Sequence, residues 1–99
     1  MSFLSSSFEI TTSVTTLYQS PVDKESNVHT LILLNPATSG SIEVTLQYYN
    51  NVSAVTTQFK KVTLNGGDSW ELPKTVNFQP GDRLEAFTDT GTINALVSN

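Results

Sequence analysis

The residue types that most often carry enzymatic chemistry are scarce in this chain, which has one histidine and no cysteine. His29 lies within VHTLILLN, the most apolar run of the sequence. A hydrolytic nucleophile needs a base within hydrogen-bonding reach, and no G-x-S-x-G or comparable motif accompanies this histidine. We therefore expect His29 to be structural and the chain to have no catalytic residue. An enzyme would need a pocket that brings His29 together with a carboxylate.

Carboxylates and glycines that might bind a metal or a phosphate all fall in turn-like segments. Asp68 and Asp82 each follow a glycine, and Asp89 is followed by Thr90-Gly91. Aspartate in such a position bonds nearby backbone, and the three are not spaced as calcium ligands. Gly66-Gly67 and Pro80-Gly81 open no helix and lack the Lys and Ser/Thr of a P-loop. These residues predict turns, with no metal site and no cofactor site.

Three aromatic residues are candidates for a surface that stacks on sugars. Alternation along the expected strands puts Trp70 and Tyr48 on the apolar side, as core residues, and leaves Tyr49 facing solvent. If Trp70, Tyr48 and Tyr49 gathered on one exposed face instead, the chain would be a carbohydrate-binding or receptor-binding module. A carbohydrate-binding or receptor-binding module is therefore the alternative function from another class.

The stretch from Val62 to Asp89 indicates which elements position these residues. Asn65-Gly66-Gly67-Asp68 and Gln79-Pro80-Gly81-Asp82 are strong turn signals, because glycine permits positive φ and proline presets φ. Between them apolar residues recur at even spacing, namely Trp70, Leu72, Val76, Phe78 and Leu84. This alternation is typical of short β-strands.

Similar patterns predict strands along the rest of the chain. We expect a long strand over 8–18 with a kink or a switch between sheets, a polar loop over 20–27, and further strands over 28–34, 42–49, 54–64, 83–88 and 92–98. Residues 28–34 are apolar on both faces, so that strand is either the middle of the core or an interface. A change of parity between Phe59 and Val62 predicts a β-bulge at Lys60-Lys61 with both side chains in solvent. The last two strands should leave Phe87 and Leu96 on an outer face.

No helical period of ten or more residues occurs, and turn signals return every 8 to 12 residues. The fold class is therefore all-β, an antiparallel β-sandwich or jelly roll of about eight strands. We expect an N-terminal arm over residues 1–7, loose in isolation, and a single β-sandwich domain over 8–99.

Composition excludes several classes of partner. The net charge is −4, with five Lys and Arg in all. Binding to nucleic acid needs clustered Lys and Arg to neutralise phosphates, so a nucleic-acid partner is not expected. The N-terminus lacks the features of a secretory signal, and no run approaches 18 apolar residues, so we expect neither secretion nor a membrane span. Hydrophobic residues make up only 37% of the chain and no disulfide is possible, which favours stabilisation by association with neighbours.

From Asn27 onward, the strands and turns follow one another in a recognisable order. An apolar strand ending in Asn (VHTLILLN) precedes a strand like IEVTLQYY, then a Gly-Gly turn with a Ser-aromatic-Glu-Leu strand (NGGDSWELP), a Pro-Gly-Asp turn into an amphipathic strand (FQPGDRLEAF), and a closing strand (TGTINALVS). This order resembles small β-sandwich bacteriophage virion structural proteins of the head decoration or cement type. The resemblance covers about seventy residues and supplies no functional residue to carry over.

The resemblance implies a virion structural protein on the capsid surface, made in the host cytoplasm. Its partners would be the major capsid protein or other virion proteins, and a position in the phage neck, tail or fibre is the nearest alternative. From composition and strand parity we expect either a closed cyclic homo-oligomer, with a trimer as the expected size, or a protomer that is monomeric alone and becomes fixed on a capsid lattice. The expected partner surfaces are Phe3 and Leu4 in the arm, which could add a strand to a neighbour, and Phe87 with Leu96 as an apolar pair on adjoining strands.

Overall fold

The computed structural model describes residues 5–38 and 40–98 of the chain. In these residues it contains ten β-strands and no helix, and therefore no helix able to cross a membrane. The strands are β1 Ser5–Ile10, β2 Thr15–Gln19, β3 Ser26–Val28, β4 Thr30–Leu34, β5 Ser41–Asn50, β6 Val55–Asn65, β7 Ser69–Glu71, β8 Val76–Phe78, β9 Arg83–Thr88 and β10 Ile93–Ser98.

The strand pairing is that of one long hairpin folded over on itself. β1 pairs with β10, β2 with β9, β3 with β8, β4 with β7, and β5 with β6, all antiparallel. The closing turn of this hairpin is formed by residues 51–54. Two further pairings, β10 with β4 and β5 with β9, close two four-stranded sheets. Sheet A has the order β1-β10-β4-β7, sheet B has the order β2-β9-β5-β6, and β3-β8 forms a short ribbon.

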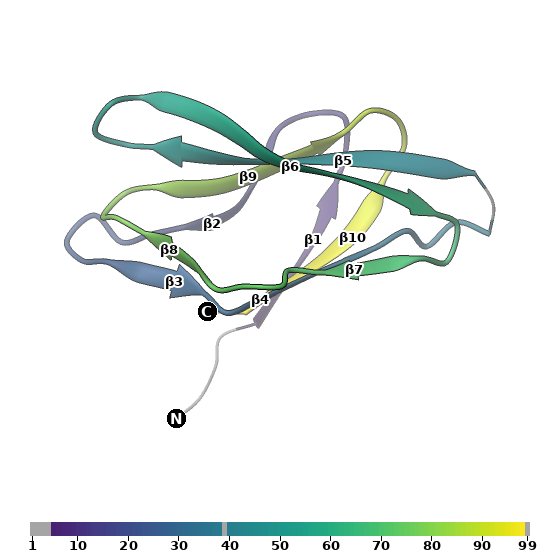
Figure 1. Cartoon of the computed structure of the whole chain (residues 1–99), viewed down its shortest axis with the longest axis horizontal. Helices are drawn as coiled ribbons and strands as arrows, with labels where there is room; N and C mark the ends of the chain where they lie inside the picture. The colour runs from purple at the N-terminus through teal and green to yellow at the C-terminus, as the bar shows by residue number, and fades with distance from the viewer. Residues whose placement is uncertain (1–4, 39, 99) are drawn as a thin grey trace.

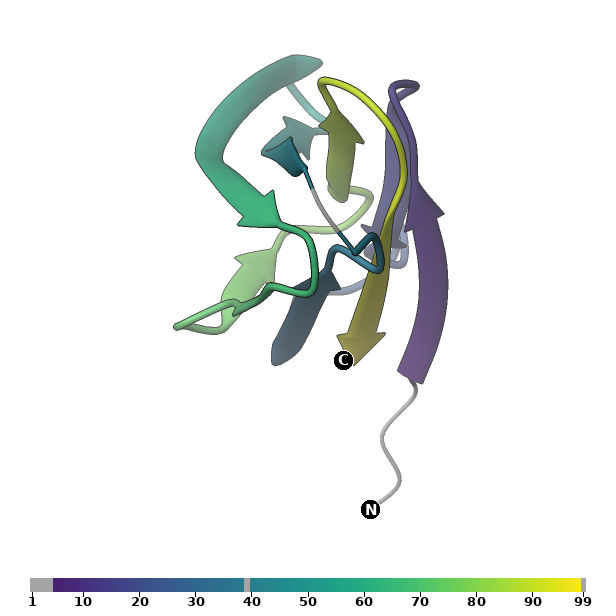
Figure 2. The ribbon, with the colours of Figure 1, turned by 90° about the vertical axis from the view of Figure 1, so that its right-hand side faces the viewer.

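The two sheets form the layers of a sandwich, seen in two orientations in Figures 1 and 2. Nested antiparallel pairs divided between two sheets are the jelly-roll form of a β-sandwich, so the predicted fold class is confirmed. The predicted switch between sheets is also confirmed, because β1 belongs to sheet A and β2 to sheet B. Residues 11–14 make the crossing, and the Thr11 carbonyl accepts the Thr88 N–H at 2.8 Å at its start.

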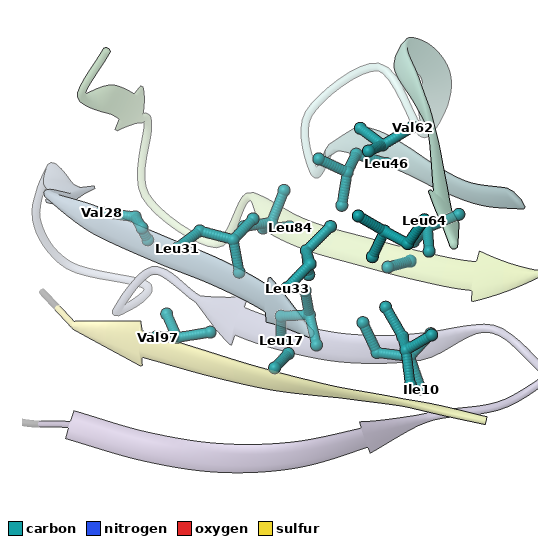
Figure 3. Close-up of a cluster of buried hydrophobic side chains, with 14 of the residues drawn as sticks. Ile10, Leu17, Val28, Leu31, Leu33, Leu46, Val62, Leu64, Leu84 and Val97 are labelled. Atoms are coloured by element: carbon teal, nitrogen blue, oxygen red, sulfur yellow. The ribbon is translucent and has the colours of Figure 1, made fainter. Parts of the chain in front are cut away.

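The core lies between the sheets and is formed by alternating residues of both inner faces (Figure 3). Its fully buried large side chains include Ile10, Leu31, Leu33, Leu46, Phe78, Leu84 and Ile93. Trp70, predicted as a core residue, faces this cluster but is only half-buried. The reason is that β7 is a three-residue strand at the edge of sheet A, and none of the described strands pairs with its open side.

The predicted bulge is present in β6, one residue earlier than expected. Leu46 lies opposite Lys60 and Gln47 lies opposite Gln58, which leaves Phe59 without a partner in β5. Lys60 and Lys61 are both exposed, as predicted. All of residues 55–61 are exposed, so the bulge lies in a part of the hairpin that adds little to the core.

Three expected boundaries are wrong. The strand expected over 28–34 is divided at His29, with Val28 in β3 and residues 30–34 in β4. The other two errors assigned strand residues to an arm and to a loop. Residues 5–7, assigned to a loose arm, belong to β1, with Ser5 opposite Ser98 and Ser7 opposite Leu96. Ser26 and Asn27, assigned to a loop, belong to β3. In both cases a ladder of main-chain hydrogen bonds orders polar residues that have no strand pattern of their own. The arm residues 1–4 lie outside the described part of the chain.

Candidate functional site

The outer face of sheet A carries an exposed apolar strip. Leu96 of β10 lies opposite Ile32 of β4, and Leu34 follows two residues later on the same face. Leu34 and Leu96 are each 39% exposed, whereas Leu33 between the two β4 residues is fully buried. We call Ile32, Leu34 and Leu96 the sheet A patch. Apolar side chains grouped on an exposed sheet face are typical of a partner surface.

The patch lies in a shallow groove with a polar rim. The groove is lined by residues of β1, β4 and β10: Ser7, Phe8, Glu9, Ile32, Leu34, Asn94, Ala95 and Leu96. The four strands of sheet A contain two carboxylates, Glu9 and Glu71, and no lysine or arginine. Glu71 lies opposite Ile32, at the other side of the strip from Glu9. This arrangement is complementary to a protein surface with apolar side chains and basic residues around them.

Phe87 and Leu96 do not form the apolar pair expected from the sequence. Each points to an outer face, as alternation predicted, but β9 belongs to sheet B and β10 to sheet A. Their side chains therefore lie on opposite sides of the sandwich. Residues 89–92 look like a hairpin turn in the sequence, yet they carry the chain from one sheet to the other. Leu96 instead joins Ile32 and Leu34, from the strand that was predicted to be apolar on both faces.

The other two predicted interface residues, Phe3 and Leu4, lie outside the described residues. The described chain begins with Ser5, opposite Ser98 at the end of β10. Their proposed role in anchoring a neighbour stays a prediction.

The outer face of sheet B has a different character, because polar side chains on it bind one another. Gln47 Nε2 donates to Glu85 Oε1 at 2.8 Å, and Arg83 Nε lies 3.1 Å from Glu85 Oε2. The Arg83 guanidinium lies over the Tyr49 ring, 4.0 Å from its centroid. Gln47 and Glu85 are buried even though they lie on an outer face. Arg83 Nε is buried and makes no hydrogen bond to the described residues, so it is held by the ion pair with Glu85 alone. The network makes this part of the outer face of sheet B polar, in contrast to the patch on sheet A.

A second polar cluster centres on Asp82, which is fully buried. Its carboxylate accepts hydrogen bonds from the Tyr48 hydroxyl, from the Asn51 N–H at 2.9 Å and from the Gln79 N–H at 3.2 Å. Burial alone would raise the pKa of Asp82, but the three hydrogen bonds together lower it below its usual value. Burial, followed by the bond to Asp82, raises the pKa of Tyr48 to about 12.

The predicted turn role of the aspartates holds locally for two of them. Asp82 accepts the Gln79 N–H and Asp68 accepts the Asn65 N–H at 3.2 Å, each three residues back. Asp89 Oδ1 accepts the N–H of Glu43, which is distant in sequence, at 3.0 Å. All three carboxylates therefore hold backbone groups. Among the described residues, no three His, Asp or Glu side chains are grouped so as to hold a metal ion.

The aromatic residues weighed for sugar stacking do not form one platform. Trp70 faces the core from sheet A, and Tyr48 faces the core from sheet B, with its ring stacked on Phe78. Tyr49 points outward from sheet B and is covered by Arg83. His29 is exposed in the single-residue gap between β3 and β4. Its main-chain N–H donates a hydrogen bond to the Ser98 carbonyl at 3.0 Å.

The networks around Asp82 and Glu85 were not found by sequence reasoning. Arg83 and Glu85 share one face of a strand by alternation, which is a signal for an ion pair. The partners Gln47 and Tyr48 come from β5, more than thirty residues away, and the sequence does not show that β5 pairs with β9.

Comparison with known proteins shows a shared fold. No protein-family model and no curated protein matches the sequence. The structure is similar to the crystal structure of PirA, with a TM-score of 0.61 and 10% sequence identity over 95% of this chain and 90% of that chain. It is also similar to a protein of the Bacillus endospore appendages, described as a novel family of disulfide-linked pili, with a TM-score of 0.49 and 13% identity over 98% of this chain and 83% of that chain. At such identities the similarity concerns the fold alone.

Proposed function

We propose that this protein is a structural component of a bacteriophage virion, of the head decoration or cement type. In this proposal it binds the capsid surface through the sheet A patch, after synthesis in the host cytoplasm. The observation that carries the proposal is the exposed apolar strip on one sheet face, with carboxylates on either side. The order of strands and turns, which resembles that of small virion proteins, gives the setting. No catalytic step is part of the proposal.

The fold is compatible with this role but does not specify it. Jelly rolls form viral capsid domains and also lectin and cupin domains, so function must be argued from the surface. Here one outer face carries the polar network of Gln47, Arg83 and Glu85, and the other carries the apolar strip. Such an asymmetry is expected of a protein that lies on a larger assembly. The partner would be the major capsid protein or another virion protein that offers apolar side chains within a basic rim.

The test is the binding of purified protein to particles from which this protein has been removed. The patch variant is the double substitution Leu34→Ser with Leu96→Ser. If the partner covers the exposed part of both side chains, each change removes roughly 1 to 2 kcal/mol of binding free energy. We expect at least a tenfold loss of affinity.

The matched control is the double substitution Val22→Ser with Val52→Ser. These valines are 80% and 89% exposed and lie in loops outside both sheets, so the control removes exposed apolar groups without touching the patch. We expect it to bind as wild type does. Phe87→Ser, on the opposite face, and a deletion of residues 1–4 test the other predicted partner surfaces separately.

The outcomes are distinct. Equal binding by the patch variant and wild type would show that the sheet A patch is not the docking surface. Failure of the wild type to bind heads would overturn the decoration role, and binding to necks or tails instead would support the alternative position in the particle. Circular dichroism of each variant establishes that it is folded.

A further inference from the structure

The two four-stranded sheets have four edge strands, β1 and β7 in sheet A and β2 and β6 in sheet B. An edge strand presents unpaired N–H and C=O groups and can pair with another chain unless a short length, a bulge, a lysine or a proline prevents it. Whether each edge has such protection can be read from its length, register and sequence.

Three of the four edges are protected. β6 has the bulge at Phe59 and the exposed Lys60-Lys61 pair. β2 has a register shift between Thr16 and Tyr18. β7 has three residues only, and Pro73 follows it by two positions. Each of these features interrupts the regular ladder that an added strand would need.

β1 has none of these features. Its six residues, SSSFEI, contain no proline and no lysine, and they pair with β10 in unbroken register from Ser5 opposite Ser98 to Ile10 opposite Ile93. On its other side, no described strand pairs with it. Figure 2 shows β1 along one margin of the molecule. This is the edge of the fold that is long, regular and open.

We propose that the occupant of this edge is β1 of a second copy, added antiparallel across a two-fold axis perpendicular to sheet A. The pair would form one continuous eight-stranded sheet. A two-fold axis uses the same strand from both copies, so it closes the assembly and leaves no free β1 edge. Main-chain hydrogen bonds would supply the contact, as in other cases of strand addition.

The sequence of β1 is compatible with pairing to itself. Residues opposite one another must lie on the same face, so the axis must pass through a residue position, at Ser7 or Phe8. An axis at Ser7 places Glu9 opposite Ser5 of the second copy. The two Glu9 carboxylates are then four residues apart along the strands, roughly 13 Å, which exceeds the Debye length of about 8 Å at physiological salt. Because an axis at Phe8 would bring these charges closer, we place it at Ser7.

This pairing also gives the half-buried side chain of Phe8 a neighbour. Phe8 lies on the inner face, opposite Ala95, and is only half-buried, since β1 is an edge strand and no described strand pairs with its other side. In the pair it would lie opposite Ser6 of the second copy, beneath a continuous sheet. The axis keeps the outer faces of both copies on the same side, so the two sheet A patches would face one partner together and bind it with greater avidity.

Self-association can be tested on the free protein, so its failure is distinct from failure of the virion role. Five paired residues form a small contact, and we expect a concentration-dependent monomer–dimer equilibrium in sedimentation rather than the trimer expected at first. Ser7→Glu places two like charges opposite each other at the axis and should weaken the dimer at least tenfold. Since Ser7 is exposed, this variant should fold as wild type does. Thr56→Glu, on the protected β6 edge, is the matched control and should leave the equilibrium unchanged.

Because the sequence contains no cysteine, a single introduced cysteine can test by cross-linking whether two β1 strands lie side by side. Ser7→Cys should give a covalent dimer with a short thiol cross-linker, whereas Thr56→Cys, also exposed on an edge strand, should not. The proposal is overturned if wild type is monomeric at every concentration or forms a trimer. It is also overturned if Ser7→Glu associates as wild type does, or if Thr56→Cys cross-links as efficiently as Ser7→Cys.

Discussion

Tyr48 donates a hydrogen bond to the buried carboxylate of Asp82, joining strand β5 to the turn that precedes β9. The same carboxylate accepts the Asn51 N–H in the closing turn of the β5–β6 hairpin and the Gln79 N–H in its own turn. The Tyr48 ring stacks on Phe78 of β8 with 5.2 Å between ring centroids and 4° between planes. One carboxylate therefore fixes two turns and the end of β5, and we expect stability to depend on its ionisation.

Asp82→Asn should lower the free energy of unfolding at neutral pH and remove part of its pH dependence. The asparagine amide replaces one acceptor oxygen with an NH₂ group, which cannot accept from the Tyr48 hydroxyl or from the main-chain N–H groups. At least one of these donors is left unpaired, at a cost of roughly 1–3 kcal/mol. Because folding lowers the pKa of Asp82 from 3.8, its contribution is complete above about pH 5 and is lost as pH falls through 3.8 toward the folded pKa. Urea unfolding between pH 3 and 7 measures both effects.

Asp68→Asn is the control for this measurement, since Asp68 is exposed and accepts one local N–H. Its effect at neutral pH should stay below about 1 kcal/mol. A constant difference between wild type and Asp82→Asn from pH 3 to 7 would show that the charge of Asp82 does not stabilise the fold.

Tyr48→Phe should remove the hydroxyl bond and keep the stacked ring. A hydrogen bond to a charged group contributes about 1.5–3 kcal/mol, so a loss of that size is expected at pH 7. Folding raises the pKa of Tyr48 from 10.0 to about 12, so this residue stabilises the fold fully below pH 10, and the contribution is lost as pH rises from 10 to 12. The gap between wild type and Tyr48→Phe should therefore narrow over that range.

Tyr18→Phe provides the comparison with a neutral partner. Tyr18 also packs on Phe78, with 5.4 Å between centroids, and its hydroxyl donates to Ser26 Oγ at 2.6 Å. Loss of this bond should cost only about 0.5–1.5 kcal/mol. If the two Tyr→Phe variants are equally destabilised, the charge of Asp82 gives the Tyr48 bond no added strength.

Most of the secondary structure could be predicted from local patterns. The turn at residues 65–68 contains Gly67 with φ of +84°, and the turn at 79–82 contains Gly81 with φ of +81°, as expected from glycine in a turn. The predicted strand over residues 83–88 coincides with β9. Alternation places the core residues on the correct face, because which side of a strand is apolar depends only on neighbours in sequence.

The arrangement of strands could not be predicted in the same way. Phe87 and Leu96 were correctly placed on outer faces but wrongly joined, since the sequence does not reveal that the chain changes sheet between them. The sheet A patch likewise depends on the pairing of β4 with β10, which brings together residues more than sixty positions apart. Long-range pairing also explains why β1 extends into the serines that were read as an arm.

Gly81→Ala should destabilise the fold more than Gly67→Ala. Both glycines have positive φ, which costs an alanine roughly 1–2 kcal/mol. A Cβ at Gly67 would meet nothing within 4 Å, whereas a Cβ at Gly81 would lie 2.6 Å from Asn51 Nδ2 and 3.2 Å from Asn51 Cβ. We expect about 1 kcal/mol for Gly67→Ala and about 2–4 kcal/mol for Gly81→Ala.

The contribution of the contact can be isolated with Asn51→Ala. In the double variant with Gly81→Ala, the crowding atoms beyond Cβ are removed, so the two changes should be less than additive by about 1 kcal/mol. Strict additivity, or equal effects of the two glycine substitutions, would mean that backbone strain alone accounts for the loss.

Deleting Phe59 should be tolerated, because the bulge places it outside the regular ladder. With Phe59 removed, Gln58 stays opposite Gln47 and Lys60 stays opposite Leu46, so the rest of β6 keeps its faces. Phe59 is 41% exposed and its neighbours from 55 to 61 are exposed as well, so little core contact is lost. We expect the free energy of unfolding to change by no more than about 1 kcal/mol. If the bulge lay within the core, deleting a residue there would turn core side chains outward and prevent folding.

Deleting Thr63 is the matched test of register in the same strand. Thr63 lies between Val62 and Leu64, which are 7% and 2% exposed and both face the core. Because side chains alternate, removing the residue between them turns one of these two side chains to the opposite face. Exposing one such side chain should cost about 1.5–3 kcal/mol, and the deletion should add the strain of a shifted turn. Urea unfolding of the two deletion variants against wild type measures the contrast. A Phe59 deletion as damaging as the Thr63 deletion would show that the bulge residue is required for folding, and that β6 depends on its irregular register rather than merely accommodating it.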